Sequence, residues 1–351
     1  MRILHFLWGL ANGGAENLAV DLANEQSNEH DVILLVANAM VDDFVRARVV
    51  PSVRFVCLGR PEGSRNPYWV ARLLIALRAI RPDIVHSHEG SLSTLGRLIA
   101  TPMVLTVHTT DVELPGGATR FSVVCCISES VLLDVKQRYP LLDVRQVDNG
   151  IAISKLATRE RSRSSSVRAV QVSRLVHETK GQDLLLRALA IVHADPSPPN
   201  LTIDFVGDGL SLEYLKTMAT ELGVAEHCKF LGAMSRDDVY ENLCNYDVLV
   251  QPSRIEGFGL TVAEAMAAGV AVVVSDVEGP MEVIGRGKFG HFFRSNDVES
   301  LAATLRKVIR AINTPEGIKL LTSARNHVAE KYDLIQTSRR YCEIYKQITN
   351  G

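Results

Sequence analysis

The chain lacks the patterns that mark several classes of protein, and each absence excludes a class. Its 351 residues hold 38 lysines and arginines against 40 acidic residues, for a formal net charge of −2. This balance, without a basic tail, argues against nucleic acid as a partner. None of the six cysteines forms a C-x-x-C pair, so neither a disulfide framework nor a cysteine zinc site is expected. We expect buried, reduced thiols in a cytoplasmic protein.

Long apolar runs are also missing. No stretch approaches the roughly 20 apolar residues that span a bilayer. The N-terminal sequence MRILHFLWGLANGG has an apolar run too short for a signal peptide and is typical of a first strand that leads into a glycine-rich turn. We therefore expect a soluble protein, at most peripheral to a membrane.

What the chain does have is a repeated alternation of strand-like and helical segments. Its length suits two domains. In the first half, apolar runs predict strands at 3–8, 31–37, 53–58, 83–87, 104–108 and 123–127, and helices at 14–26, 68–80, 91–100 and 129–138. Such alternation predicts parallel βαβ units.

The polar, serine-rich segment 154–167 predicts a linker, after which the alternation restarts. Strands are predicted at 169–172, 201–206, 229–231, 248–250 and 272–275, and helices at 182–194, 212–222, 301–312, 318–332 and 335–348. The predicted fold is α/β, with two Rossmann-like doubly wound domains facing a central cleft. Ligands of such sheets bind beyond the carboxyl ends of the strands.

The most informative segment is DVLVQPSRIEGFGLTVAEAMAAGVAVVVS, at 247–275. A predicted strand ends in a loop with Glu256, and the glycines that follow lead into a helix that carries Glu264. Glycines let the backbone approach a ligand closely, and the free N–H groups of a helix N-terminus favour an anion such as a diphosphate. The two carboxylates suit sugar hydroxyls, because they accept hydrogen bonds.

Two cations follow another predicted strand. Arg174 comes just after the strand that ends near Ser173, and Lys180 and Gly181 start the next helix. Two positive charges at a strand end can hold a diphosphate leaving group. A third strand ends in the tight glycine turn FVGDG, at 205–209, where a ligand can sit against the backbone.

These motifs, in this order, resemble those of the family 4 retaining glycosyltransferases, which have the GT-B fold. The matching pieces are GGAE at 13–16, HSH at 86–88, TVH at 106–108, NGI at 149–151, SRL and KG within 173–181, VGDG at 206–209, and EGFGLTVAE at 256–264. The resemblance covers nearly the whole chain. It implies an N-terminal acceptor-side domain, 1–153, a nucleotide-sugar domain, 168–332, and a C-terminal helix, 333–351, that packs back on the first domain.

The resemblance also implies a role for each matching position. Arg174 and Lys180 would bind the donor diphosphate, and Glu264 would hold the ribose hydroxyls. Glu256 and His108 would lie at the reacting sugar, with Glu256 stabilising the transferred group. The donor would further contact Gly207, Gly257, Phe258, Gly259 and Leu260, and the acceptor side would involve Gly13, Gly14, Glu16 and His88.

We expect neither a metal nor a dinucleotide cofactor. His86 and His88 alternate along a strand and could face one ion, with Glu89 or Asp111 as conceivable third ligands. No D-x-D motif follows a strand, however, and a structural or acceptor-side role is the preferred interpretation. The sequence GLANGGAE does not give G-x-G-x-x-G, so NAD is not expected.

The arginine-rich segment 60–81 is open to two interpretations. Apolar residues at 70, 73, 74, 77 and 80 share one helical face, which favours an ordinary core helix with solvated arginines. The alternative is a patch that contacts an anionic membrane surface or a lipid-diphosphate acceptor, formed by Arg60, Arg65, Tyr68, Trp69 and Arg72.

The segment VEGPMEVI, at 277–284, followed by GKFG, resembles bacterial polysaccharide enzymes that use UDP-sugars. We therefore expect transfer of a hexose or N-acetylhexosamine, from a UDP-sugar in preference to GDP-mannose, to a glycan or lipid-linked glycan. The expected setting is cell-surface polysaccharide or lipopolysaccharide synthesis, in the cytoplasm or at the inner face of the plasma membrane. The alternatives are a nucleotide-sugar epimerase of the same fold and a non-catalytic sugar-binding protein.

Overall fold

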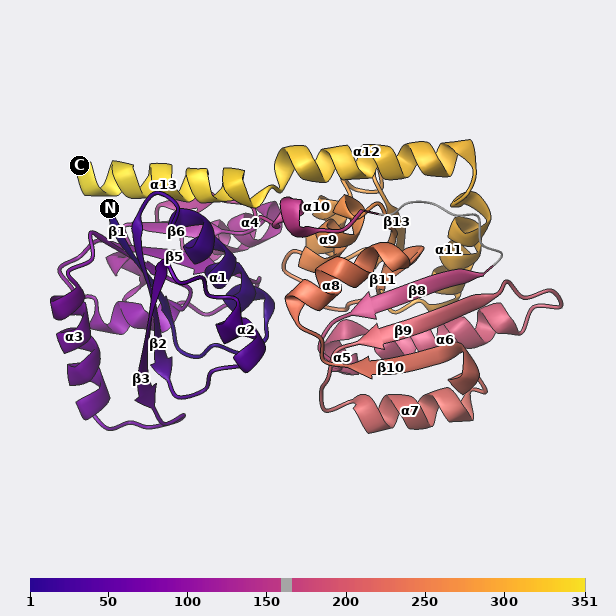
Figure 1. Cartoon of the computed structure of the whole chain (residues 1–351), viewed down its shortest axis with the longest axis horizontal. Helices are drawn as coiled ribbons and strands as arrows, with labels where there is room; N and C mark the ends of the chain where they lie inside the picture. The colour runs from indigo at the N-terminus through magenta and orange to yellow at the C-terminus, as the bar shows by residue number, and fades with distance from the viewer. Residues whose placement is uncertain (159–165, 351) are drawn as a thin grey trace. The chain divides into compact units, whose positions relative to one another are not determined.

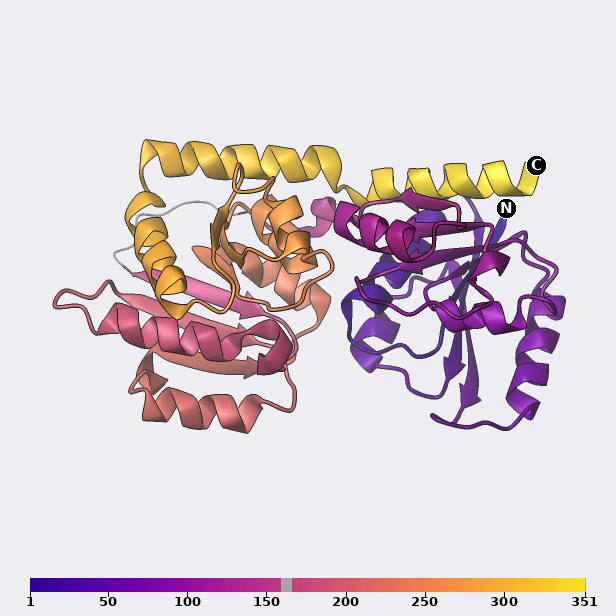
Figure 2. The same ribbon diagram turned by 180° about the vertical axis from the view of Figure 1, so that it is seen from behind.

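The computed structural model describes residues 1–158 and 166–350. The chain forms two compact units, the first from Met1–Ala152 with Tyr332–Gly351 and the second from Ile153–Lys331 (Figures 1 and 2). Of the predicted linker at 154–167, residues 159–165 lie outside the described residues. At its two ends, Ile153–Lys155 form a 3-10 helix and Val167 begins a strand.

Unit 1 is built on a parallel sheet of seven strands in the order β3-β2-β1-β4-β5-β6-β7. The strands are β1 (Arg2–Leu7), β2 (Asp31–Asn38), β3 (Val53–Arg60), β4 (Ile84–Ser87), β5 (Met103–Val107), β6 (Val123–Cys126) and β7 (Val144–Gln146). Its α-helices are α1 (Gly14–Gln26), α2 (Asp43–Ala47), α3 (Tyr68–Ile80), α4 (Glu129–Arg138) and α13 (Leu334–Asn350). The central strands are buried on both faces, as their continuous apolar runs require.

Unit 2 repeats this plan with six parallel strands in the order β10-β9-β8-β11-β12-β13. They are β8 (Val167–Val172), β9 (Leu201–Val206), β10 (Cys228–Gly232), β11 (Val248–Gln251), β12 (Ala271–Ser275) and β13 (His291–Phe293). The α-helices are α5 (His177–Lys180), α6 (Gln182–His193), α7 (Leu212–Glu221), α8 (Arg236–Asn242), α9 (Leu260–Ala267), α10 (Glu278–Val283), α11 (Val298–Ala311) and α12 (Pro315–Lys331).

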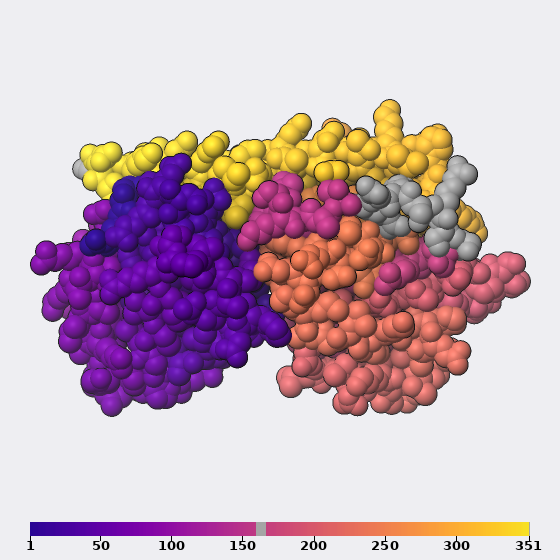
Figure 3. Space-filling view, viewed as in Figure 1, coloured from indigo at the N-terminus to yellow at the C-terminus, as the bar shows by residue number. Residues whose placement is uncertain are grey.

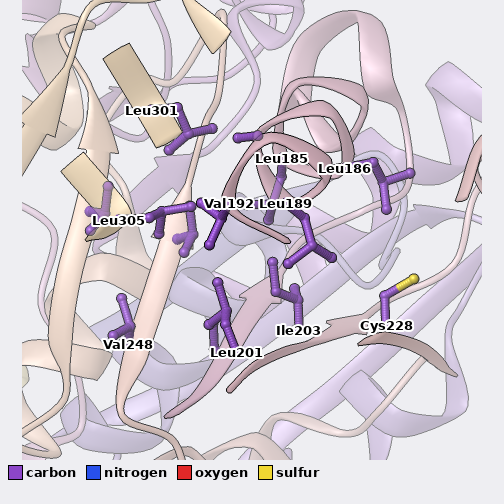
Figure 4. Packing of buried hydrophobic residues seen from close by; sticks show 14 of the residues in the cluster. Leu185, Leu186, Leu189, Val192, Leu201, Ile203, Cys228, Val248, Leu301 and Leu305 are labelled. Atoms are coloured by element: carbon purple, nitrogen blue, oxygen red, sulfur yellow. The ribbon is translucent and has the colours of Figure 1, made fainter. Parts of the chain in front are cut away.

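The core of unit 2 follows from helical spacing on α6. Leu185, Leu189 and Val192 recur every three or four residues and are fully buried. They pack with Leu201 and Ile203 of β9, and with residues of α11 such as Leu301 and Leu305 (Figure 4). The apolar face of α6 thus covers one face of the sheet and fixes the start of the helix beside the end of β8.

One predicted helix is wrong. The segment 91–100 contains only a 3-10 helix, η1 (Gly90–Leu95). Serine and threonine hydroxyls compete for backbone groups there, since Thr94 Oγ1 donates to the carbonyl of Ser91 at 2.8 Å. The other short 3-10 helices are η2 (Ala118–Arg120), η3 (Ile153–Lys155), η4 (Ala225–His227) and η5 (Leu243–Asn245).

The C-terminal helix α13 belongs to unit 1 and packs on α1 (Figures 1 and 3). The chain enters it through a backbone bond from Leu334 N to the carbonyl of Ile151, at 3.0 Å. Tyr341 and Tyr345 are fully buried on its inner face. Among the described residues, no helix has both the length and the apolar character needed to cross a bilayer.

Candidate active site

Each sheet has one point where the strand order reverses. In unit 1 the chain moves outward from β1 to β3 and then returns to β4 on the other side of β1; in unit 2 the same reversal occurs between β8 and β11. Beyond the carboxyl ends of two such strands the connecting loops diverge and leave room for a ligand. Most of the candidate residues follow the strands at these reversals, and Gly207 and His108 follow the adjacent strands β9 and β5.

In unit 2 the loop after β11 leads directly into α9. Gly259 has a positive φ of 98° and precedes Leu260, the first residue of the helix. Gly279 of α10 lies against this loop, because a Cβ there would come within 2.6 Å of the Phe258 nitrogen. Arg254 anchors the other side through a two-bond contact with Asp183, at 2.8 and 2.9 Å. The N-terminus of α9 is therefore held in a fixed position, with the free N–H groups that make a helix start suitable for an anion.

The structure brings Lys180 and Glu256 together. Lys180 Nζ donates to Glu256 Oε2 at 2.8 Å, and Gln251 Nε2 donates to the same oxygen at 3.2 Å. Both charged side chains are about one-fifth exposed, at 20% and 19%. A cation and a carboxylate thus stand side by side, 76 residues apart in sequence, at the reversal between β8 and β11.

Arg174 follows β8 and its side chain is exposed to solvent. Its backbone is fixed, since Gln182 Nε2 donates to the Arg174 carbonyl at 2.9 Å. Gly207, which is predicted to lie against a ligand, also packs closely on the chain itself: a Cβ there would come within 2.0 Å of the Ser173 carbonyl oxygen. The glycine turn after β9 therefore packs against the loop that carries Arg174.

Glu264 is buried on α9, with only 2% of its surface exposed. Its Oε1 accepts hydrogen bonds from Arg236 Nη2 and from the Tyr240 hydroxyl. Arg236 Nε also donates to the Tyr240 hydroxyl at 2.7 Å, which orders all three groups. The sequence prediction missed Arg236 and Tyr240, because α8 is a short helix with no motif. This network holds the carboxylate in one orientation.

In unit 1, four histidines gather around the reversal between β1 and β4. His5 of β1 is in register with His86 of β4, and His88 and His108 follow the ends of β4 and β5. Ring nitrogens join His5 to His88 and His88 to His108, both at 3.2 Å. The ligand atoms of His5, His86 and His88 all lie within 4.8 Å of one another. From the sequence we predicted that His86 and His88 lie close together, but not that His5 lies beside them.

Burial keeps these rings neutral. It lowers the pKa of both His5 and His108 to about 4, and it holds the pKa values of His86 and His88 well below the usual range. His86 is also hydrogen-bonded on both nitrogens, to Thr106 Oγ1 at 2.7 Å and to the Tyr345 hydroxyl at 2.5 Å. Because Tyr345 belongs to α13, this helix packs directly against the histidine cluster.

The glycine-rich turn after β1 carries the remaining candidates. Gly13 precedes α1, and Gly14 and Glu16 lie in its first turn. The Glu16 carboxylate folds back over Gly13, where a Cβ would meet its Oε2 at 2.4 Å. Burial, with a smaller contribution from Glu16, raises the pKa of nearby Glu89 to about 7. Glu89 therefore carries a partial negative charge at neutral pH.

The arginine-rich segment divides into a pocket wall and an exposed face. Arg60 points inward, where it donates to Asn38 Oδ1 at 2.7 Å and lies 5.2 Å from the centre of the Trp8 ring. It lines an open pocket with an empty volume of about 490 Å³, whose other walls include Trp8, Leu58, Trp69, Leu73 and Leu95. Arg65, which also borders the pocket, is exposed, as are Tyr68 and Arg72.

The neutral histidines make unit 1 sensitive to acid. The unfolded chain takes up protons near pH 6.5, whereas folded His5 and His108 do so only near pH 4. Their contribution is therefore fully present above pH 6.5 and is lost as the pH falls toward 4. We expect the urea midpoint of unit 1 to fall over this range, measured by tryptophan fluorescence, since both tryptophans lie in unit 1. A midpoint that does not change between pH 7 and 4.5 would contradict this account.

Two doubly wound parallel sheets, each with one reversal of strand order, define an α/β protein of the GT-B type. Residues 12–155 match the family model described as Glycosyltransferase Family 4, and residues 155–319 match Glycosyl transferases group 1. The chain belongs to the family 4 glycosyltransferases.

Individual relatives agree with this assignment. Glycogen synthase of Mycobacterium tuberculosis is 25% identical over 300 residues, which are 78% of this chain and 71% of that protein. The solved structure of Anabaena HepE in complex with UDP-glucose is 22% identical, with a TM-score of 0.82, over 99% of this chain and 100% of that one. The lipopolysaccharide outer core galactosyltransferase WaaB is 18% identical, with a TM-score of 0.75, over 99% and 100%.

Proposed function

We propose that this glycosyltransferase moves a hexose or N-acetylhexosamine from a UDP-sugar to a glycan or lipid-linked glycan, with retention of anomeric configuration and without a metal ion. The observation that carries the proposal is the cluster in unit 2 of Arg174, Lys180, Glu256 and the N-terminus of α9. Two cations and a helix N-terminus supply the positive potential that a diphosphate needs.

The proposed chemistry takes place on one face of the sugar. The bond between the anomeric carbon and the β-phosphate oxygen breaks while the acceptor oxygen attacks from the same side. The acceptor proton passes to the leaving phosphate. Arg174 and Lys180 stabilise the charge that builds up on the diphosphate. Glu256, held between Lys180 and Gln251, faces the positive character that develops at the sugar.

Glu264 is proposed to bind the ribose hydroxyls. Its carboxylate is buried and fixed by Arg236 and Tyr240, so its orientation is set before a ligand arrives. The backbone of 257–260, together with Gly207, is proposed to line the rest of the donor site. UDP is favoured over GDP because HepE, which shares the fold, is solved with UDP-glucose.

The acceptor is proposed to bind unit 1. Gly13, Gly14 and Glu16 follow β1, and His88, which bonds to His108, follows the neighbouring strand β4. The open pocket between β3 and α3 combines tryptophan walls with Arg60 and Arg65, which suits a sugar ring joined to an anionic group.

We propose a peripheral membrane contact on the outer side of α3, at the cytoplasmic face of the plasma membrane. Tyr68 and Ile75 are 56% and 64% exposed there, next to Arg65 and Arg72. Exposed apolar groups beside cations fit the interface of an anionic bilayer. The setting would be the synthesis of a cell-surface polysaccharide or lipopolysaccharide, as for the named role of WaaB.

A transfer assay with an excess of chelator tests the central proposal. A screen of UDP- and GDP-sugars by thermal shift would first identify the donor, because a ligand at a hundred times its Kd adds about 2.7 kcal/mol of stability. We expect turnover with that donor to require an acceptor glycan, to persist in chelator, and to yield a product that keeps the donor's anomeric configuration by NMR.

An inverted product would contradict retention, and loss of activity restored by manganese would contradict metal independence. Release of an epimerised sugar without acceptor would support the epimerase alternative.

A further inference from the structure

A continuous line of hydrogen bonds runs through unit 1 from the end of α1 to the end of β5. His5 Nε2 lies 2.8 Å from Gln26 Oε1, His5 Nδ1 lies 3.2 Å from His88 Nε2, and His88 Nδ1 lies 3.2 Å from His108 Nε2. Gln26 and His5 are at most 2% exposed, and His88 is 5% exposed. His108, at the outer end, is half-buried. A buried amide is thus connected to a candidate catalytic residue.

The ring geometry agrees with hydrogen bonds in the plane of the rings. The centroids of His5 and His88 are 5.5 Å apart with an interplanar angle of 21°, and those of His88 and His108 are 5.4 Å apart at 25°. Each pair meets nearly edge to edge at close nitrogen atoms. His86 and His88 differ, since their centroids are only 4.4 Å apart and one ring lies over the other.

The amide of Gln26 determines the direction of every bond in the line. A carbonyl oxygen only accepts, so His5 must carry its proton on Nε2. A neutral imidazole has one N–H, which leaves His5 Nδ1 as an acceptor for His88 Nε2–H. By the same rule His88 Nδ1 accepts from His108 Nε2–H. The line ends with a lone pair on His108 Nδ1.

The rule applies only to neutral rings, and burial provides that condition. It lowers the pKa values of His5, His88 and His108 below the physiological range, to about 4 for the first and last. Among the described residues, no hydrogen bond to His108 Nδ1 is formed. This nitrogen is the one available to a ligand.

We propose that Gln26, His5 and His88 are positioning residues that hold His108 in its Nε2–H tautomer, so that Nδ1 accepts a hydrogen bond from the hydroxyl of a bound sugar. An acceptor at this point favours sugars with a hydroxyl facing it and disfavours those with a carboxylate there, such as uronic acids. The sugar-recognition part rests on the proposed function; the tautomer does not.

A metal ion is the competing explanation for a histidine cluster, and the hydrogen bonds argue against it. An ion held by His5, His86 and His88 would need an unprotonated nitrogen from each ring. Both nitrogens of His86 are already bonded to Thr106 and Tyr345. His5 and His88 bond each other through the nitrogens that would have to turn toward the ion.

The test is NMR of the full chain labelled with ¹⁵N-histidine at neutral pH, with His108 assigned by its loss in His108→Asn. Long-range proton–nitrogen correlations report which ring nitrogen carries the proton. We expect the Nε2–H tautomer at His5, His88 and His108 in the wild-type protein. The Nδ1–H form at His108 would overturn the proposal, and so would resonances of His5 and His88 that shift together on titration with zinc.

A substitution of Gln26 tests the positioning role. Gln26→Met keeps the length of the side chain but removes the oxygen that accepts from His5. We expect His108 to populate both tautomers in Gln26→Met, with kcat/KM for the identified donor lower by about tenfold, the scale of one misdirected hydrogen bond. Gln347→Met is the control, because Gln347 is exposed on α13.

The outcomes for the tautomer and for transfer are independent. If the protein shows the expected tautomers but turns over no nucleotide sugar, the positioning role of Gln26, His5 and His88 is supported and the proposed function is rejected. Normal transfer in Gln26→Met with mixed tautomers would reject the role of Nδ1 in recognising the sugar. An unchanged His108 spectrum in folded Gln26→Met would show that Gln26 does not set the proton position.

Discussion

A chain that ends at Tyr332 is expected to lose transfer completely, although every residue proposed to bind the donor is still present. Helix α13 supplies buried contacts that unit 1 cannot replace. Tyr341 bonds to Thr106 at 2.9 Å, Tyr345 bonds to His86, and Leu334 lies against Gly150, where even a Cβ would come within 2.6 Å of it. Each large buried side chain contributes roughly 3–5 kcal/mol, so the loss of several exceeds the 5–15 kcal/mol that stabilises a typical domain.

The expected signature of this deletion is selective. Tryptophan fluorescence should show unit 1 unfolded, because both tryptophans lie there. The donor nucleotide should still bind unit 2 and raise its melting temperature. A chain shortened only by residues 347–351, none of them buried in the described part, is the matched control and should keep its activity. Full transfer by the chain that ends at Tyr332 would show that α13 is a surface appendage.

Most of the fold could be predicted from the sequence, because the buried strands and long helices carry strong periodic patterns. The strand at 31–37 and the helix at 14–26 lie within a residue of β2 and α1. Several short elements were missed, because three to five residues give no period: α2, α5 and β13 are of this kind. The helix predicted at 91–100 was wrong because hydroxyl groups compete with helical hydrogen bonds.

The candidate site was only partly predictable. Sequence order placed Arg174, Lys180 and Glu256 at strand ends, and parallel strands bring such ends to one edge of a sheet. What the sequence does not indicate is pairing across long separations. Glu264 meets Arg236, and His86 meets His5, because of strand order and helix placement. A period-two pattern alone does not reveal that β1 and β4 are neighbours.

The substitutions Arg174→Ala and Lys180→Ala are each expected to lower kcat by about a hundredfold or more, which is the scale for removing one group that stabilises developing charge. Both side chains are at least partly exposed, Arg174 in the loop after β8 and Lys180 at the end of α5, so the fold should survive. The measurements are steady-state transfer with the identified donor and thermal melting of each variant.

The structure separates the two variants in a way that the sequence does not. The Arg174 side chain is exposed, so its removal should leave the melting temperature unchanged. Lys180 neutralises Glu256 at 2.8 Å. Without Lys180, the Gln251 amide is the one hydrogen-bond donor that the described residues give to Glu256 Oε2. Lys180→Ala should therefore also lower the stability of unit 2, by roughly 1 kcal/mol for a partly exposed pair.

A double variant resolves whether Glu256 acts through Lys180 or on the sugar. Glu256→Gln in the Lys180→Ala background removes the unpaired charge and should restore the stability of unit 2. If Glu256 also stabilises the reacting sugar, kcat should fall further rather than recover. Lys216→Ala is the matched control, because Lys216 forms an exposed pair with Glu213 at 2.9 Å on α7. Near-normal turnover in both Arg174→Ala and Lys180→Ala would reject the diphosphate site, because Arg254, the cation that follows β11, is already paired with Asp183.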